Sequence, residues 1–499
     1  MAELAAQRET LHMLNTSHLS PNAVFIGTQC EAEPDGAVGV KELYRALMSQ
    51  QRPDAASVAA FLQEQLAAAA SMPVDLPEDF STLEQWSRDH VAAVGEAYRA
   101  YLDARKGGEP RRYFPTRSHA LHFIRGVAPT KLVDGAWLFG ILGKWEDPSS
   151  RGLIRTYLEE LGDGVPGQNH VVLYQKLLAA NDCEGTESLS DDHYLQGAIQ
   201  LALAYGADAF LPEIIGYNLG YEQLPLHLLI CGYELNELGI DPYYFTLHVT
   251  IDNADNGHAQ KAIAAISQFA PALGDRDAFA RRVRAGYRLN ELGASTLSVI
   301  ADFNLESALV DILVGKSDFG KNMHSDYCRV GGRSVNDWLS KPDDIPLFLS
   351  AMEDAGWIKR GEPAANSRFW QLLQGPRAEM FGVFNAYELQ VLEDWIAAPS
   401  TGQGRTPRIV PHRAQMRMLD RLAQEEQRPQ AAIRGLIRHH PQAGDVSEAS
   451  ELRLLEERIG AMSSKAAAMH ELQAWMAPHQ HFTPLGLMAT RMYARLLDA

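Results

Sequence analysis

Apolar residues recur at helical spacing along most of the chain. Residues 55–70 are rich in Ala, Leu and Gln and contain neither glycine nor proline, which predicts a helix. Residues 82–102 continue the pattern, with an apolar or aromatic side chain every three or four positions. From 113 to about 313, apolar stretches are joined by short turns, the clearest at 162–167. The alternation typical of strands is scarce, so we predict an all-α fold built around a helical bundle.

Breaks in this pattern divide the chain into five parts. Gly107-Gly-Glu-Pro110 ends a helical N-terminal region, and a run rich in Gly, Pro, Ser and Thr after Ala397 is a linker by composition. The predicted parts are an N-terminal region (1–110), a bundle (111–320), a mixed Trp-rich region packed on the bundle (321–396), the linker (397–410) and a helical C-terminal appendix (411–499). The two ends either cover the bundle or build a homodimer.

Composition and charge narrow the range of partners. The chain has 499 residues, of which 46% are hydrophobic, and a net charge of −18, which argues against nucleic acid or an anionic membrane surface as its main partner. The four cysteines show no CxxC spacing, so we expect neither a thiolate metal site nor a disulfide framework. The N-terminus lacks the apolar stretch of a secretory signal, and no apolar run reaches about 18 residues. We therefore expect a cytoplasmic protein.

The segment 244–258 carries the densest candidate chemistry. On a helix, His248, Asp252 and Asp255 fall on one stripe, and His258 follows after Gly257. Burying imidazoles and carboxylates is costly unless something binds them, and this mixture of nitrogen and oxygen ligands suits iron or manganese. A hydrogen-bonded polar cluster without a metal is the alternative.

Two further stretches offer ligands to the same site. Glu160 and His170 flank a break rich in glycine and proline, so Glu160 is expected to close one helix and His170 to open the next. A capped helix–turn–helix with a surface glutamate is the alternative. Glu213 interrupts an apolar run, where a carboxylate must be neutral or paired. Glu222, at the more polar end of the same run, competes with Glu213 for the role of ligand.

Together these positions give six ligands drawn from several helices. Three imidazoles and three carboxylates can hold two iron ions and leave positions open for oxygen. The predicted set is Glu160, His170, Glu213, His248, Asp252 and either Asp255 or His258.

These motifs resemble the haem-oxygenase-like dimetal oxidases and oxygenases, which are iron-containing redox enzymes, and in particular a long-chain branch of them. The stretches 160–164, 247–258, 330–338 and 380–384 carry the resemblance, which covers roughly residues 113–395. It implies a seven-helix haem-oxygenase-like bundle that binds two irons in place of haem, with manganese in one site as a variant. It also implies O2 as co-substrate and an external electron donor.

One departure from the family pattern concerns the last ligand. The family's usual triplet is His-x3-Asp-x2-His, and here Asp255 occupies the third position. We favour His258 over Asp255 because it restores the family's balance of ligands. A haem site built on His119 or His122 is rejected, because six polar ligands would then stand in the haem cavity without purpose.

The resemblance implies three kinds of reaction, namely N-oxygenation of amines or guanidines, oxidative desaturation, and C–C cleavage of amino or fatty acids. We favour N-oxygenation of a small amine or amino acid in specialised-metabolite biosynthesis. An arginine beside the cavity can hold a substrate carboxylate, although ordinary salt bridges are the alternative reading. The candidate substrate anchors are Arg284, Tyr287, Asn290, His324 and Arg329. A non-catalytic helical protein that stores metal or has a structural polar cluster is the alternative of another class.

Overall fold

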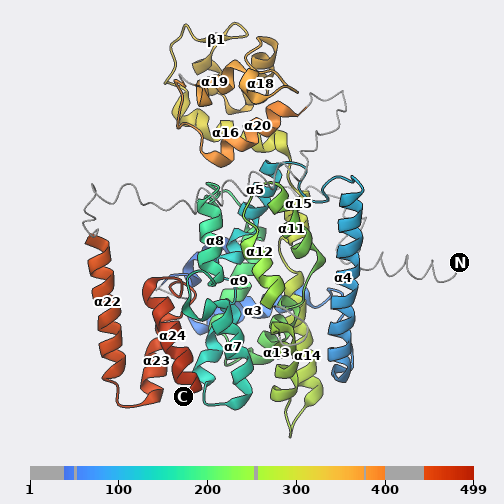
Figure 1. Cartoon of the computed structure of the whole chain (residues 1–499), viewed down its shortest axis with the longest axis vertical. Helices are drawn as coiled ribbons and strands as arrows, with labels where there is room; N and C mark the ends of the chain where they lie inside the picture. Colours follow the sequence, from blue (N-terminus) through green and yellow to red (C-terminus); the bar gives the residue numbers. More distant parts are fainter. Residues whose placement is uncertain (1–38, 50–52, 252–256, 376–377, 399–442) are drawn as a thin grey trace, which may run out of the picture.

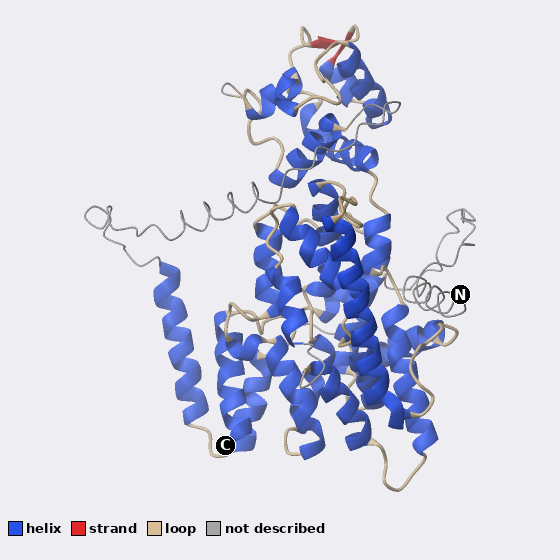
Figure 2. Cartoon of the chain, turned by 45° about the vertical axis from the view of Figure 1, so that its right-hand side comes forward, coloured by secondary structure: helices blue, strands red, loops and turns tan. Residues whose placement is uncertain are grey.

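The structure is a computed structural model that describes residues 39–49, 53–251, 257–375, 378–398 and 443–499. Helices dominate these residues, which confirms the predicted all-α fold (Figures 1 and 2). Within the described ranges, the sheet consists of two short antiparallel strands, β1 (Arg329–Val330) and β2 (Arg333–Ser334). Figure 2 shows it at one end of the molecule, far from the centre of the bundle.

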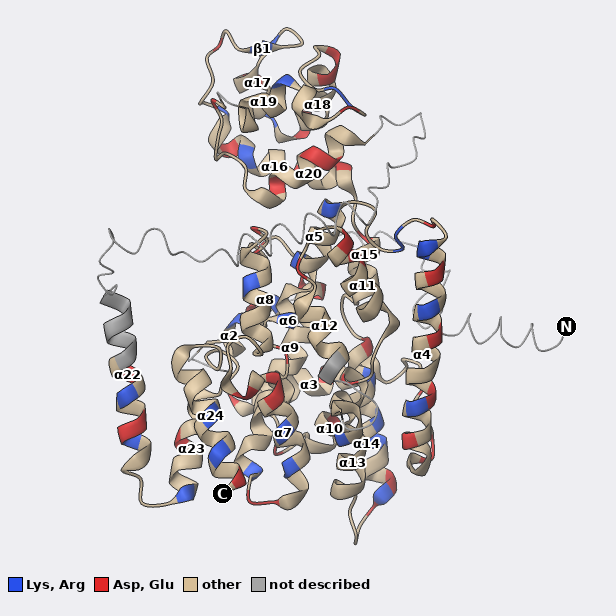
Figure 3. Ribbon diagram, viewed as in Figure 1, with Lys and Arg blue, Asp and Glu red and all other residues tan. Residues whose placement is uncertain are grey.

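The N-terminal helices are α2 (Val40–Leu47), α3 (Ala55–Ala69) and α4 (Leu83–Lys106). The predicted helices at 55–70 and 82–102 are therefore confirmed. Helix α3 begins where the Asp54 carboxylate accepts a hydrogen bond from the Ser57 backbone N–H at 2.8 Å, an ordinary N-cap. Along α4, Lys and Arg alternate with Asp and Glu (Figure 3). In the described part of the chain, no helix has both the length and the apolar character needed to cross a membrane.

The central bundle follows, and its apolar side chains divide between two core clusters. Its helices are α5 (Arg117–Gly126), α6 (Ala128–Lys131), α7 (Arg151–Glu160), α8 (His170–Ala179), α9 (Asp191–Tyr205), α10 (Leu211–Tyr221), α11 (Leu226–Glu237), α12 (Tyr243–Ile251), α13 (His258–Phe269), α14 (Arg276–Arg288) and α15 (Thr296–Ala301), with the 3₁₀ helix η2 (Ala136–Lys144) between α6 and α7. Helices α10 and α14 touch backbone to backbone, since a Cβ at Gly216 or Gly286 would overlap the other helix. This contact fixes the position of α10, which carries Glu213 in its first turn and is followed by Glu222.

One buried carboxylate fastens α11 to the chain that enters the bundle. Glu234 is fully buried and accepts a hydrogen bond from the Tyr101 hydroxyl at 2.7 Å. It also accepts hydrogen bonds from three consecutive backbone N–H groups, those of residues 112–114. Burying a carboxylate is costly unless its oxygens accept such hydrogen bonds. Glu234 therefore joins α4, the start of the bundle and α11.

A second lobe stands above the bundle in Figure 1. It consists of the two strands and of α16 (Leu305–Gly320), α17 (Val335–Leu339), α18 (Ile345–Asp354), α19 (Arg368–Gln374) and α20 (Ala386–Ala397). Its core includes Trp338 and Trp395 and is continuous with apolar side chains of α5, α8, α11 and α12. Helix α16, which the predicted boundary at 320 assigned to the bundle, packs against α17, α18 and α20.

The C-terminal helices are α22 (Ala443–Gly460), α23 (Lys465–Trp475) and α24 (Pro484–Asp498). Helices α23 and α24 pack on the bundle, where buried tyrosine hydroxyls bind backbone carbonyls. The Tyr157 hydroxyl donates to the Met476 carbonyl at 2.6 Å, and the Tyr493 hydroxyl donates to the Leu142 carbonyl at 2.7 Å. Tyr157 lies on α7, so the C-terminal helices support the helix that ends at Glu160.

Candidate metal centre

Two groups of buried carboxylates and imidazoles lie in the middle of the bundle. The histidine-rich group contains Asp134, Glu160, His170 and His248. The carboxylate-rich group contains Glu160, Glu222 and His258. In each group every residue offers one ligand atom within 4.8 Å of the others, and Glu160 belongs to both. The two groups are therefore neighbours joined by one carboxylate.

The turn between α7 and α8 brings Glu160 and His170 together. Helix α7 ends at Glu160 and α8 begins at His170, as the break rich in glycine and proline predicts. Gly162 has a φ of 63°, and a Cβ there would overlap the backbone of residues 168–169, so the chain doubles back closely. Asn169 caps α8 by accepting from the Val172 N–H at 3.0 Å and donates to the Leu161 carbonyl at 3.2 Å.

Asp134 enters the site from the turn between α6 and η2. The next residue, Gly135, has a φ of 78° and lies against the Glu160 side chain. Asp134 was not among the predicted ligands, because it belongs to no recognisable motif. Its one sequence signal is that it is the only charged residue in the apolar run 132–143. In the structure Asp134 is 1% exposed.

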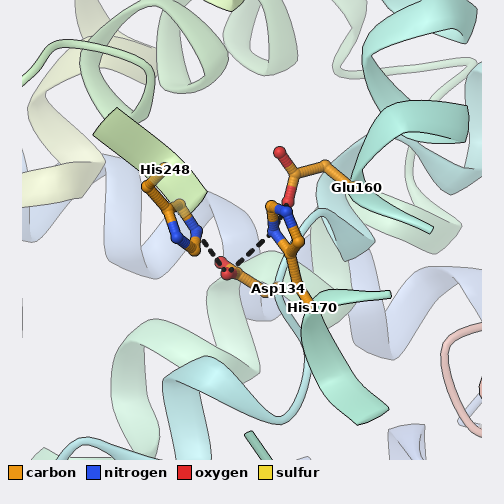
Figure 4. A group of neighbouring side chains, drawn as sticks. All are labelled: Asp134, Glu160, His170 and His248. Atoms are coloured by element: carbon orange, nitrogen blue, oxygen red, sulfur yellow. Dashed lines mark hydrogen bonds and ion pairs between the residues drawn. The ribbon is translucent and has the colours of Figure 1, made fainter. Parts of the chain in front are cut away.

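The histidine-rich group is arranged around the Asp134 carboxylate (Figure 4). Its Oδ2 lies 3.1 Å from His248 Nε2 and 3.6 Å from His170 Nδ1. His170 Nδ1 is also 2.6 Å from Glu160 Oε2. His248 Nδ1 donates to the Tyr244 carbonyl at 2.8 Å, one turn earlier on α12. That bond fixes the ring and leaves Nε2 to face the group, which is the usual arrangement of a metal-binding histidine.

The carboxylate-rich group is arranged around His258, the first residue of α13. Its Nδ1 lies 3.2 Å from Glu160 Oε1 and 3.1 Å from Glu222 Oε2. Its Nε2 donates to Glu159 Oε2 at 2.8 Å, and Lys261 donates to the same oxygen. Glu159 therefore orients the ring from outside, so that Nδ1 points at the two inner carboxylates.

Burial and pairing act in opposite directions on the protonation of these groups. Burial alone lowers the pKa of the His170 imidazole, but Glu160 and Asp134 outweigh it and raise that pKa to about 10. Burial alone raises the pKa of the Asp134 carboxyl, but Lys131, His170 and His248 hold it well below its usual range. The site thus strongly favours ionised carboxylates facing positive charge, whether that charge is carried by protons or by a metal.

The residues present fit divalent metal ions. Nε2 of His170 and Oε1 of Glu222 are buried and have no hydrogen-bond partner among the described residues. Buried polar atoms without partners are costly, and a metal ion would satisfy them. Two imidazoles with carboxylates form the donor set associated with non-haem Fe(II), and a set richer in carboxylate also suits Mn(II).

Comparison with known proteins agrees with this chemistry. Residues 121–291 match the family of iron-containing redox enzymes. The match is consistent with the family that the sequence motifs resemble, and all six residues of the two groups lie within the matched region. No curated protein and no solved structure matched the chain. The family and the cluster of Asp, Glu and His residues together support an iron oxidoreductase.

The structure brings together four of the ligands predicted from this family's pattern, namely Glu160, His170, His248 and His258. Asp252 and Asp255 lie outside the described residues. The prediction placed His248, Asp252 and Asp255 on one helical stripe, with His258 following after Gly257; in the structure α12 spans Tyr243–Ile251 and α13 begins at His258. Gly257 is extended, with φ −80° and ψ −172°. His248 and His258 therefore come from separate helices and reach different groups.

Glu213 does not join either group. It lies in the first turn of α10, where Arg282 donates from Nε to its Oε1 and from Nη2 to its Oε2, both at 2.6 Å. Glu222 follows the last residue of α10, about 13 Å further along the helix axis. The structure thus places the competing candidate, Glu222, beside His258. The pairing with Arg282 supplies the partner that a carboxylate in an apolar run requires.

Three of the predicted substrate anchors bind other parts of the protein. Arg284 and Tyr287 hydrogen-bond the segment 75–77, with the Tyr287 hydroxyl donating to Asp75 at 2.7 Å. Asn290 donates to the Tyr217 carbonyl at 3.1 Å. These contacts fasten α14 and η5 (Leu289–Glu291) to the N-terminal region and to α10. A role in substrate binding for the three residues stays a prediction.

The remaining two anchors, His324 and Arg329, lie in the second lobe. The His324 backbone N–H donates to the Asn336 side chain at 3.2 Å, and Arg329 donates to the Gly332 carbonyl at 3.1 Å. Both contacts are local to the turn that precedes α17. These contacts do not test a role in substrate binding, which for these two residues stays a prediction.

Proposed function

We propose that this chain is an O2-dependent non-haem iron oxidoreductase with a two-metal centre. Asp134, His170 and His248 would hold one ion, Glu222 and His258 the other, and Glu160 would stand between them. The observation that carries the proposal is that Glu160 belongs to both buried groups, with one oxygen near His170 and the other near His258. A carboxylate shared in this way is how helical bundles hold metal pairs.

A pair of iron ions bound here would supply electrons and sites for O2. The protein's own contribution is to hold the ligand side chains in fixed orientations before the metals bind. Glu159 and the Tyr244 carbonyl orient His258 and His248, so each ring presents one fixed nitrogen. The full burial of His170 excludes water from the side chain that links Asp134 to Glu160. A dry, preorganised set of ligands strengthens every electrostatic contact with bound ions.

For the substrate, we propose a small amine or amino acid that undergoes N-oxygenation in specialised-metabolite biosynthesis. The resemblance of the motifs to haem-oxygenase-like dimetal oxygenases supports this choice. Desaturation or C–C cleavage of an amino or fatty acid is the alternative within the same chemistry, with reducing equivalents from an external donor in either case. The three outcomes differ in product mass and in whether the product nitrogen gains oxygen.

The metal centre is tested by anaerobic reconstitution with Fe(II), followed by iron analysis of the desalted chain. Wild type should retain about two ions per chain. Glu222→Gln removes a ligand from the carboxylate-rich group and should lower the content to about one. Glu213→Gln is the matched control, because Glu213 is the carboxylate at the other end of the same helix, and its iron content should equal that of wild type. Wild type without iron would overturn the proposal.

The reaction is tested by mixing the iron-loaded chain with ¹⁸O2 and panels of amines, amino acids and fatty acids. O2 consumption that depends on a substrate, with ¹⁸O on its nitrogen, is the expected result. A product two mass units lighter, or a shortened carbon chain, would instead identify desaturation or C–C cleavage. Two bound irons with no oxygen consumption across the panels would favour a metal-storing protein.

A further inference from the structure

Two tyrosines, the buried Tyr244 and the partly buried Tyr221, donate hydrogen bonds to the two oxygens of the Asp134 carboxylate. The Tyr221 hydroxyl donates to Oδ1 at 2.7 Å, and the Tyr244 hydroxyl donates to Oδ2. Lys131 donates to the Tyr221 hydroxyl at 2.8 Å and lies 4.0 Å from Oδ1. Oδ2 is the oxygen that faces the imidazoles of the histidine-rich group, 3.1 Å from His248 Nε2. Oδ1 therefore faces Tyr221 and Lys131, whereas Oδ2 faces Tyr244 and the imidazoles.

Asp134 needs these hydrogen bonds because its backbone conformation does little to restrict the orientation of its side chain. It lies in a turn, between the end of α6 at Lys131 and the start of η2 at Ala136, and Gly135 follows it. A helix would restrict the rotamers of a ligand, but a turn does so much less. The tyrosines come from regular elements instead, with Tyr221 at the end of α10 and Tyr244 at the start of α12.

The two tyrosines also connect Asp134 to other ligands. Tyr244 contributes its backbone carbonyl to His248 Nδ1 while its hydroxyl holds Asp134, so one residue orients two ligands. Tyr221 immediately precedes Glu222, whose carboxylate lies 3.1 Å from His258 in the carboxylate-rich group. The end of α10 therefore contributes to both groups with adjacent side chains.

Resting on the proposed function, we propose that Tyr221 and Tyr244 are positioning residues that fix Asp134 as a metal ligand through Oδ2. Tyr221 occupies Oδ1 and prevents that oxygen from turning toward a metal. Tyr244 keeps Oδ2 directed at the space between His170 and His248. The partners that hold a metal ligand from outside usually contribute about 10–100-fold to metal affinity, and we expect that size of effect for each hydroxyl.

Tyr174 offers a matched control. It is fully buried, its ring packs on Tyr244 at 4.6 Å between centroids, and its hydroxyl donates to the Ile124 carbonyl at 2.6 Å. Tyr174→Phe thus removes a neighbouring buried phenol hydrogen bond that does not involve Asp134. A loss of stability alone should be similar in all three tyrosine variants.

The experiment is an anaerobic Co(II) titration followed by visible ligand-field absorption, in the Glu222→Gln background so that the remaining site is the histidine-rich group. Tyr221→Phe and Tyr244→Phe should each weaken cobalt binding about 10–100-fold and change the band shape, while Tyr174→Phe leaves both as in the parent. Melting temperatures of the metal-free chains report folding separately. If either Tyr221→Phe or Tyr244→Phe fails to fold, the other variant still tests the positioning role.

The results distinguish a failure of the positioning role from a failure of the proposed metal centre. Equal cobalt affinity in the parent and in both tyrosine variants overturns the positioning role and leaves the metal centre standing. A similar weakening in Tyr174→Phe overturns it as well, because the effect would then be structural. If the wild-type chain, titrated alongside, binds no cobalt, the proposed function fails and the positioning role fails with it.

Discussion

Gly135 lies against the side chain of Glu160, so closely that a Cβ at position 135 would stand 2.7 Å from Glu160 Cβ and 2.9 Å from its Cγ. Gly135 also has a φ of 78°, which side chains other than glycine adopt only with strain. The residue after Asp134 thus leaves the space through which the shared carboxylate reaches both groups. The residue next to one candidate ligand is therefore packed against the side chain of another.

Gly135→Ala should therefore abolish binding at both groups. The added methyl group must displace Glu160, and Glu160 is the residue that the two groups share. We expect iron content after reconstitution to fall from about two per chain to near zero. Gly108→Ala is the control, because Gly108 has a φ of 98° but a Cβ added there would meet no atom within 4 Å. It should suffer similar backbone strain, about 1–2 kcal/mol, and keep its iron. Full iron content in Gly135→Ala would contradict the assignment of Glu160.

Glu159→Ala should weaken only one of the two metal sites. The substitution removes the acceptor that holds His258 Nε2 and lets the ring rotate away from Glu160 and Glu222. Competition with a chromogenic Fe(II) chelator should show one of two binding steps weakened about 10–100-fold. Lys261→Met removes the other partner of Glu159 but keeps the contact with His258, so both steps should be close to wild type. If Glu159→Ala binds Fe(II) as tightly as wild type in both steps, the hydrogen bond to Glu159 is not needed to orient His258.

Glu234→Ala should destabilise the fold without touching the metal centre. The change leaves three backbone N–H groups and the Tyr101 hydroxyl without their acceptor in a buried place. Each unsatisfied group costs about 1–3 kcal/mol, so we expect a loss of at least about 3 kcal/mol in the free energy of unfolding. Denaturant titration measures it. Glu84→Ala, which breaks the exposed ion pair with Arg88 at 3.6 Å on α4, is the comparison and should cost less. Equal losses of unfolding free energy in the two variants would mean that water accepts hydrogen bonds from the N–H groups once Glu234 is removed.

The sequence predicted the parts of the site that depend on local signals. Glu160 and His170 bracket a turn whose glycines and proline are visible in the chain, so the ends of α7 and α8 followed from turn chemistry. His248 and His258 were found because charged and polar residues interrupt an apolar run. Helical content was equally predictable, because the apolar period is local.

The rest depends on contacts that periodicity cannot reveal. Asp134 is brought to the site by a turn more than a hundred residues before His248, and only the folded bundle puts the two 3.1 Å apart. Glu213 and Glu222 interrupt the same apolar run, and what separates them is Arg282, a residue on another helix. A carboxylate in an apolar run requires a partner, but the sequence does not say whether that partner is a metal or an arginine.

The stability of the chain should fall in mild acid because of His122. Its ring packs on Phe303 at 5.0 Å, and its Nε2 is buried without a hydrogen-bond partner among the described residues. Burial, helped by the positive charges of His119 and Arg125, lowers the pKa of His122 to about 4. The unfolded chain binds a proton near pH 6.5 and the folded chain does not, so stability is full above pH 6.5 and declines toward pH 4.

His122→Leu removes this titration and should flatten the decline. Between pH 7.5 and pH 5 the wild-type chain should lose about 2 kcal/mol more unfolding free energy than the variant. Urea titrations at the two pH values measure the difference. His470→Leu changes an exposed histidine on α23 and should follow the wild-type decline. Parallel declines in wild type and His122→Leu would show that the buried ring accepts a proton in the folded chain as readily as in the unfolded one.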